Sequence, residues 1–190
     1  MPVIEGWKFL KCWEKAGVPL LTAAGYQVKS DNALRTRGKA IELVSLQRDA
    51  KKERFTINLA IAHDFARSFR DGKPAQMANG YEEAVFLARL GMLMDGKDQW
   101  WPYGKTEAEA EKTITAITGV AVAYADAWFA TLADPGAAYL ALKKGDLGRE
   151  NLWHLALYAR ALGQIPESVE WLERITPAPS HVIALKKEWG

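Results

Sequence analysis

The sequence predicts an α+β protein: an antiparallel meander sheet of four to five strands packed with an N-terminal helix and a helical C-terminal half. Three observations carry this prediction. Phe55–His63 alternates large apolar residues with small or polar ones, which is the period of a strand that is buried on one face. Turn-forming residues divide the neighbouring sequence into short segments. From Thr106 onward the apolar spacing changes to three and four residues, which indicates helices.

The opening segment, residues 4–24, reads as a helix. Trp7, Leu10 and Val18 follow helical spacing and form an apolar stripe. Pro19 is expected to break or kink this helix, because proline cannot donate a backbone hydrogen bond. Gly25 suits its end, where a left-handed conformation is common.

The strands that follow are separated by turn residues. Asp31-Asn32 is a pair that tolerates positive φ, and Gly38 marks the next turn. A charged loop, Arg48–Arg54, precedes the strand with the cleanest alternation: Phe55, Ile57, Leu59 and Ile61 point one way, and Thr56, Asn58, Ala60 and Ala62 point the other. These four strands are expected at residues 26–30, 33–37, 40–47 and 55–63.

Two segments in the middle of the chain are less regular. Residues 63–80 contain the breakers Gly72 and Pro74 and are expected to be irregular or to hold a short helix. The alternation in Glu83–Leu93 favours a fifth strand, although a helix also fits its spacing.

The C-terminal half is predicted to be helical. Thr106 and Glu109 form a capping box that begins a helix running to about Ala133, and its apolar face comprises Ile114, Ile117, Ala121, Tyr124 and Trp128. Asp134-Pro135 begins the next helix, which Gly145 ends. Further helices are expected at residues 152–162 and 166–175 and in a last segment to Trp189. We therefore expect an α+β domain over 1–145 and a helical extension over 146–190, packed as one cooperative unit.

Several short segments, in this order, resemble a bacterial family, the domain-of-unknown-function family 4304. The resemblance covers about residues 1–145 and implies the fold and the order of elements; the family has no assigned activity, so it implies no chemistry. The segments are Gly25-Tyr26, Val44–Gln47, Phe55–Ile61, Ala88–Gly91, Gln99–Trp101 and the long helix that ends near Trp128-Phe129.

Composition sets limits on the class of protein. With 190 residues, 49% of them apolar, and a net charge of +2, the chain fits one globular domain and is only mildly basic. Cys12 is the only cysteine, which excludes an internal disulfide. The first residues lack the order of a signal peptide, and the longest apolar stretch, Val120–Ala133, falls short of the ~20 residues of a membrane span. We expect a cytoplasmic protein.

No catalytic residue, metal ligand or cofactor is assigned from the sequence. His63-Asp64 could form half of a proton-transfer pair, but the scattered histidines have no spacing that enforces one; a structural or solvated His63 is the favoured interpretation. Glu82-Glu83 would point to opposite faces of a strand and could not chelate a metal together.

A candidate binding groove lies on the sheet face of small and polar residues. Its members are Gln47, Asn58, Arg89, Trp100 and Trp101, and amides, an arginine and aromatic walls would suit an anionic or planar ligand. The competing interpretation is structural: Asn58 bonds to Gln47, and Arg89 pairs with Glu42.

Three functions follow, in order of preference. Eight tryptophans can mark a recognition surface or can be core residues, so the first is a non-enzymatic bacterial protein with a protein partner, of protein-binding or adaptor type. The second is a small-molecule-binding protein or enzyme that uses the groove. The third, disfavoured by the mild charge, is nucleic-acid binding through Arg35, Arg37, Lys51 and Lys52; lysines at sheet edges also prevent aggregation. The sequence does not indicate an oligomeric state.

Overall fold

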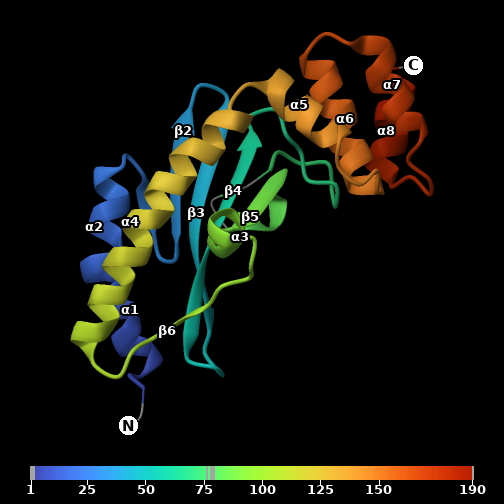
Figure 1. Ribbon diagram of the computed structural model, residues 1–190. Helices are drawn as coiled ribbons and strands as arrows, with labels where there is room; N and C mark the ends of the chain where they lie inside the picture. The colour runs from blue at the N-terminus through green and yellow to red at the C-terminus, as the bar shows by residue number, and fades with distance from the viewer. Residues whose placement is uncertain (1–2, 76, 78–79, 190) are drawn as a thin grey trace.

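The computed structural model describes residues 3–75, 77 and 80–189 and confirms the α+β class (Figure 1). Its sheet is an antiparallel meander in the order β1-β2-β3-β4-β5, and a short sixth strand pairs with the start of β4. The strands are β1 (Gln27–Lys29), β2 (Asn32–Arg37), β3 (Ala40–Asp49), β4 (Arg54–His63), β5 (Phe86–Arg89) and β6 (Trp101–Pro102).

The hairpin turns fall close to the predicted places. Lys29 pairs directly with Asn32, so the first turn is Ser30-Asp31, one residue earlier than predicted. Ser30 itself adopts a positive φ of 55°, and Asn32 belongs to the strand. The second hairpin turns at Gly38, whose φ of 58° favours glycine, as the sequence indicated.

The alternation predicted for β4 is confirmed. Phe55, Ile57, Leu59 and Ile61 are fully buried in the main core. On the other face, Ala60 and Ala62 belong to a separate small cluster with Leu43 and Met77. These residues of β4 therefore point to the sheet faces that the alternation of large apolar and small residues predicts.

Helices cover one face of this sheet (Figure 1). They are α1 (Gly6–Ala16), α2 (Val18–Ala23), α4 (Glu107–Leu132) and the short α3 (Leu90–Asp95). The predicted opening helix is thus divided at Gly17, beside Pro19. Phe9 of α1 stacks on Tyr103 at 4.1 Å and contacts Phe55 at 5.0 Å between ring centroids, which fixes α1 on the sheet.

The long helix α4 begins at the predicted cap, since Thr106 Oγ1 accepts a hydrogen bond from the Glu109 amide at 3.2 Å. Glu109 reaches back to the amide of Lys105 rather than to that of Thr106. The predicted apolar face is partly wrong: Tyr124 is 39% exposed. The buried face is instead made by Ala110, Ile114, Thr118, Ala121, Ala125, Phe129 and Leu132.

By length and composition, α4 is also long and apolar enough to cross a membrane. The core helix of a folded domain meets the same criteria. In the structure its buried side chains, Ile114 and Phe129 among them, belong to the main core beside the sheet.

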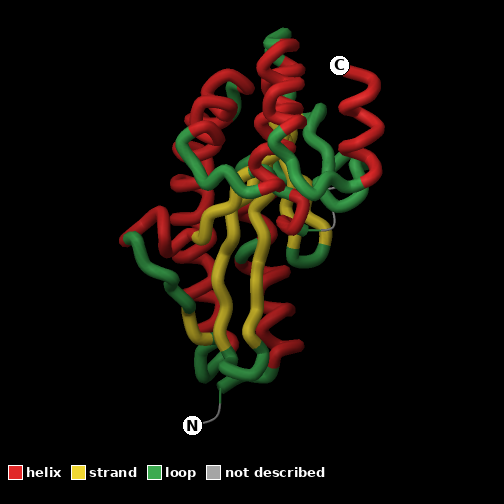
Figure 2. Tube along the Cα trace, turned by 90° about the vertical axis from the view of Figure 1, so that its right-hand side faces the viewer, coloured by secondary structure: helices red, strands yellow, loops and turns green. Residues whose placement is uncertain are grey.

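Among the described residues, no helix covers the other face of the sheet over the half near the β3–β4 loop (Figure 2). Figure 2 shows the long strands β3 and β4 there in front of the helices. Toward the end of β4, described residues of the segment that follows this strand cover this face, and Ala66 and Met77 are buried against it. Of the segment predicted to be irregular, residues 76, 78 and 79 lie outside the described residues. We call the uncovered part the helix-free face.

The ambiguous segment Glu83–Leu93 is divided between both predicted structures. Strand β5 ends at Arg89, and α3 begins at Leu90. Glu82-Glu83 lies in a 3₁₀-turn, η2 (Tyr81–Glu83), and not in the strand assumed for it. The strand itself begins only at Phe86, after the 3₁₀-turn.

The C-terminal helices pack around a second hydrophobic cluster at one end of the sheet (Figure 1). The first of them begins at Asp134-Pro135, as predicted, and the Asp134 side chain caps it by accepting from the Ala137 amide at 2.9 Å. Phe65 and Phe86 pack against this cluster from the sheet side. The helices are α5 (Pro135–Lys143), α6 (Arg149–Ala161), α7 (Ile165–Glu173) and α8 (Ser180–Trp189).

The tryptophans divide between core and surface. Trp13, Trp153 and Trp171 are buried, whereas Trp7 is 54% exposed. The others, Trp100 among them, are partly exposed. Large core residues therefore account for only some of the tryptophans.

Candidate functional site

Four of the five predicted site residues lie together on the helix-free face. The register pairs Asn32 with Ser45, Ser45 with Asn58, and Asn58 with Arg89, so four adjacent strands each contribute one polar residue to a single row. We call these four residues the polar row. Gln47 lies beside it: its Oε1 accepts from Asn58 Nδ2 at 3.0 Å and from Arg89 Nη2 at 3.4 Å.

Trp100 forms the edge of this site in a stack with two arginines. The guanidinium carbon of Arg54 lies 4.6 Å from the centroid of the Trp100 ring, and that of Arg89 lies 5.2 Å from it. Asp98 holds the arrangement, because Arg89 Nη1 donates to its carboxylate at 2.7 Å and Trp100 Nε1 donates at 3.3 Å. The hydrogen bond from Arg89 lowers the pKa of Asp98 below its ordinary value.

The fifth predicted residue, Trp101, does not join the site. It pairs with Phe55 across β4 and β6, and the centroids of the two rings lie 6.0 Å apart. Directly paired residues share a sheet face, so Trp101 faces the helices and packs against the main core. Adjacent residues in a strand point to opposite faces, which separates Trp101 from Trp100.

The site is a surface, and the polar residues at its base are largely buried. Asn58 is 1% exposed and Ser45 4%, whereas Gln47, Arg89 and Trp100 are partly exposed. A partner approaching this face therefore meets the last three side chains first. The competing structural interpretation is confirmed in one half only. The predicted hydrogen bond between Asn58 and Gln47 is present, but Arg89 pairs with Asp98 and not with Glu42.

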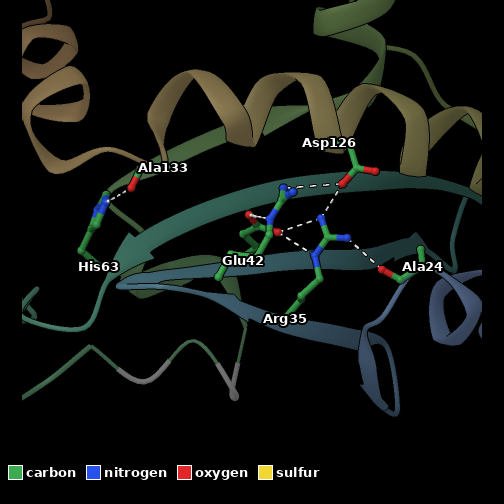
Figure 3. A network of polar contacts seen from close by, with 7 residues as sticks. Ala24, Arg35, Glu42, His63, Asp126 and Ala133 are labelled. Carbon is green, nitrogen blue, oxygen red and sulfur yellow. Dashed lines mark hydrogen bonds and ion pairs between the residues drawn. The ribbon is translucent and has the colours of Figure 1, made fainter.

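Glu42 instead joins two strands to α4 on the opposite face (Figure 3). Its carboxylate accepts from Arg35 Nε at 2.8 Å and from Arg37 Nε at 2.7 Å. Arg35 also donates to Asp126 of α4 at 2.5 Å and to the carbonyl of Ala24 at 2.8 Å. Glu42 is fully buried and the Arg35 side chain is 13% exposed. These arginines, which the disfavoured nucleic-acid hypothesis would use for phosphate contact, are occupied by internal carboxylates.

His63 has a structural position, as the sequence favoured. It is 1% exposed, its Nδ1 lies 2.7 Å from the hydroxyl of Tyr158, and its Nε2 lies 3.1 Å from the carbonyl oxygen of Ala133 (Figure 3). Burial lowers its pKa below the ordinary value. The ring thus joins the end of β4 to the helical half. Within residues 3–75, 77 and 80–189, no group of histidine, cysteine and carboxylate side chains could hold a metal ion.

Burial of His154 predicts a loss of stability in acid. Desolvation lowers its pKa from 6.5 to about 4, so the folded protein keeps it neutral where the unfolded chain takes up a proton. Between these two pH values the unfolded state binds more protons than the folded state. The free energy of unfolding therefore decreases by up to about 1.4 kcal/mol for each pH unit by which the solution is made more acidic.

Denaturant unfolding at several pH values in this window, on the natural protein and on His154→Asn, checks the prediction. The stability advantage of the natural protein is expected to shrink as the pH falls through the window. A difference that stays constant would show that His154 does not titrate in this way.

Sequence reasoning missed Asn32, Ser45 and Asp98. The position of Ser45 could have been predicted, because Ser45 and Gln47 are two residues apart on the strand predicted to neighbour β4 and therefore share a face. Asn32 was assigned to the turn, and the one-residue shift of that turn placed it in the strand. Asp98 lies in an irregular segment, so no periodic pattern indicates where its side chain points.

Comparison with known proteins places the chain in a family of similar sequences. The family model described as "Domain of unknown function (DUF4304)" matches residues 17–131, which runs from the turn between α1 and α2 almost to the end of α4. The sheet and the polar row lie inside the match, and α5 to α8 lie outside it. Neither the curated proteins nor the solved structures gave a match.

Proposed function

The chain belongs to the DUF4304 family, and we propose that it is a non-enzymatic protein-binding module, of adaptor type, of the bacterial cytoplasm. One observation supports this proposal above others: the Trp100 ring lies within 5.2 Å of the guanidinium carbons of both Arg54 and Arg89, beside the polar row. Tryptophan and arginine are the residues most enriched among those that dominate the energy of protein interfaces. The stack is partly exposed, so a partner can bury it further.

The stack is also held in place before a partner arrives. Arg89 is bonded to Asp98 and Gln47, and the indole nitrogen of Trp100 is bonded to Asp98. Side chains that are already ordered lose little conformational entropy on binding. Each guanidinium has five donors, so both arginines keep donors for an acceptor on the partner.

The charge near the stack favours an acidic partner. The loop between β3 and β4 carries exposed Lys51 and Lys52, for which the described residues show no ion pair. The side chains of Arg54 and Arg89 are each 33% exposed beside it. A protein surface that presents carboxylates would complement this group and associate faster at low salt.

The two other functions have less support. A small ligand held by Asn58, Gln47 and Arg89 would have to reach Asn58, which is 1% exposed. Nucleic-acid binding through Arg35 and Arg37 would compete with their bonds to Glu42.

Capture of partners from the native host on the immobilised protein tests the proposal. We expect a stoichiometric partner whose affinity, measured with the purified partner, falls about 30-fold or more in a variant carrying Arg89→Ala and Trp100→Ala. One such anchor contributes about 2 kcal/mol or more, which is about 30-fold, and the contributions of two neighbouring anchors are not additive. The matched control is Trp7→Ala, which removes an exposed tryptophan from α1, away from the helix-free face. It is expected to bind as the natural protein does.

Two results would count against the proposal. One is that no stoichiometric partner is recovered. The other is a partner that the double variant retains with full affinity, since such a partner uses a different surface.

A further inference from the structure

The outer edge of β5 ends the sheet on one side. This strand pairs with β4 and with no other strand that the structure describes. A strand at the end of a sheet leaves one row of backbone N–H and C=O groups outside the ladder. Such a row can pair with a strand of another chain, so the edge of β5 is a surface on which a second sheet can continue the first.

The two edges of the sheet differ in how they are protected against such pairing. The opposite edge is β1, which has only three residues and carries exposed Lys29; short strands and lysines are common protection of an edge. Strand β5 contains neither lysine nor proline. Its Leu87 is 51% exposed, and of the exposed large hydrophobic residues in the described part of the chain it alone lies in a strand. The apolar, unprotected edge indicates that pairing is used here.

The alternation of β5 determines which side chains meet when two copies pair. Leu87 pairs with Ala60 and Arg89 with Asn58, so both lie on the helix-free face. If two β5 strands pair antiparallel about a twofold axis perpendicular to the sheet, residues of the same face stand opposite each other. Of the two registers centred on β5, one sets Leu87 opposite Leu87 of the second copy, and the other sets it opposite Arg89. Both registers bury Leu87.

A hollow of about 420 Å³ beside Leu87 can receive Arg89 of the second copy. Val85 and Leu87, the two residues that stand opposite Arg89 in these registers, both line it. Its lining also includes the exposed carboxylates of Glu82 and Glu150. Arg89 uses one donor for Asp98 and one for Gln47, and a guanidinium has five. It therefore keeps donors for these carboxylates.

We propose that two copies of the chain pair antiparallel through the outer edges of β5, with Arg89 of each copy against Glu82 and Glu150 of the other. The charges favour a second copy over an unrelated strand. A cation at one end of β5 and carboxylates at its other end complement each other twice about a twofold axis. The inference goes beyond the protein-binding function, because the pairing uses the edge of the sheet and needs no other protein.

Sedimentation equilibrium of the full chain tests whether this dimer forms. We expect a monomer–dimer equilibrium with a dissociation constant of about 10 to 100 µM, because a four-residue edge buries less area than a standard interface. The dimer should weaken as salt is raised, since it contains opposite charges. A monomer at every concentration up to about 500 µM would overturn the proposal and leave the edge to a strand of another protein.

The variant Leu87→Lys tests whether the dimer uses this edge. It replaces an apolar contact with a cation beside Arg89, so dimerisation is expected to weaken at least about tenfold. Because Leu87 is 51% exposed, the fold is expected to survive, and thermal melting checks this. The matched control is Leu140→Lys on α5, where the leucine is 59% exposed; it should dimerise as the natural protein does. A dimer that Leu87→Lys retains, or an equal loss in the control, would contradict the proposal.

Reversal of charges tests the contact between Arg89 and the hollow. Glu150→Lys and Arg89→Glu each place like charges against each other, so each alone is expected to weaken the dimer by about tenfold. The variant with both changes exchanges the two charges and should dimerise more tightly than either single variant. A double variant as weak as the sum of the two losses would show that Arg89 and Glu150 do not meet, which would overturn the proposed arrangement.

Discussion

Replacing Ile57 with Asp is expected to unfold the protein at room temperature. Ile57 is fully buried in the middle of β4, and its neighbours in the main core include Phe55 and Leu59, which are also fully buried. An unpaired carboxylate at this position has no described partner and must either stay charged in an apolar environment or take up a proton. The change should therefore cost more than about 4 kcal/mol, a large share of the stability of a domain.

Circular dichroism and thermal melting of the purified variant check this result, with two control substitutions. Lys51→Ala, in the exposed β3–β4 loop, should change the free energy of unfolding by less than about 0.5 kcal/mol. Leu87→Asp introduces the same side chain on β5 at a residue that is 51% exposed, so it should be tolerated. A folded Ile57→Asp with an unchanged melting temperature would contradict the assigned face of β4.

The strand around Ile57 could be predicted because its signal is local. Period two needs only the order of residues, and it correctly separated the face of Ile57 from the face of Asn58. Helix starts were equally local: the side chains of Thr106 and Asp134 bond to backbone amides three residues away, so the sequence contains both partners.

The site was less predictable where it depends on register and on irregular segments. Gln47, Asn58 and Arg89 were grouped correctly because the meander order brings their strands side by side. Trp100 and Trp101 were treated as one wall, although adjacent residues of an extended segment point to opposite faces. The same rule had been applied to Glu82-Glu83, so the separation of the two tryptophans could have been predicted.

The partner of Glu42 is a case in which sequence reasoning chose the wrong arginine. Arg89 was the expected partner, but the registers place Arg35 directly opposite Glu42 on β3, whereas Arg89 lies opposite Asn58. Glu42 also faces α4, because it pairs with Ile61 of the core-facing set. A residue shift in register changes the face of a strand residue, and local spacing does not determine register.

This buried carboxylate leads to the second large effect, for Glu42→Gln. The amide keeps the shape but loses the charge, so Arg35, 13% exposed, loses its buried counter-ion and keeps only Asp126. Breaking a buried ion pair by removing one partner costs about 3–5 kcal/mol, and we expect a loss near the lower value because Arg37 is 42% exposed and can turn to solvent. Urea unfolding of both proteins measures the difference.

A matched ion pair on the surface distinguishes the effect of burial on the free energy of unfolding from the effect of charge. Lys15 and Glu111 lie 2.7 Å apart, but the Lys15 side chain is 71% exposed, so Glu111→Gln should cost about 1 kcal/mol or less. Equal losses in the two variants would show that burial of Glu42 contributes nothing.

A double substitution tests whether the Glu42 carboxylate serves to satisfy Arg35. If Glu42 serves to satisfy Arg35, replacing both together, Arg35→Met with Glu42→Leu, should recover most of the stability that Glu42→Gln loses, because apolar residues of similar volume can replace a buried ion pair. If the double variant is instead less stable than Glu42→Gln, the bonds from Arg35 to Asp126 and to the carbonyl of Ala24 are what hold α4 and α2 to the sheet. The network would then act as a clamp between β2 and the helices, with Glu42 orienting the guanidinium that forms it.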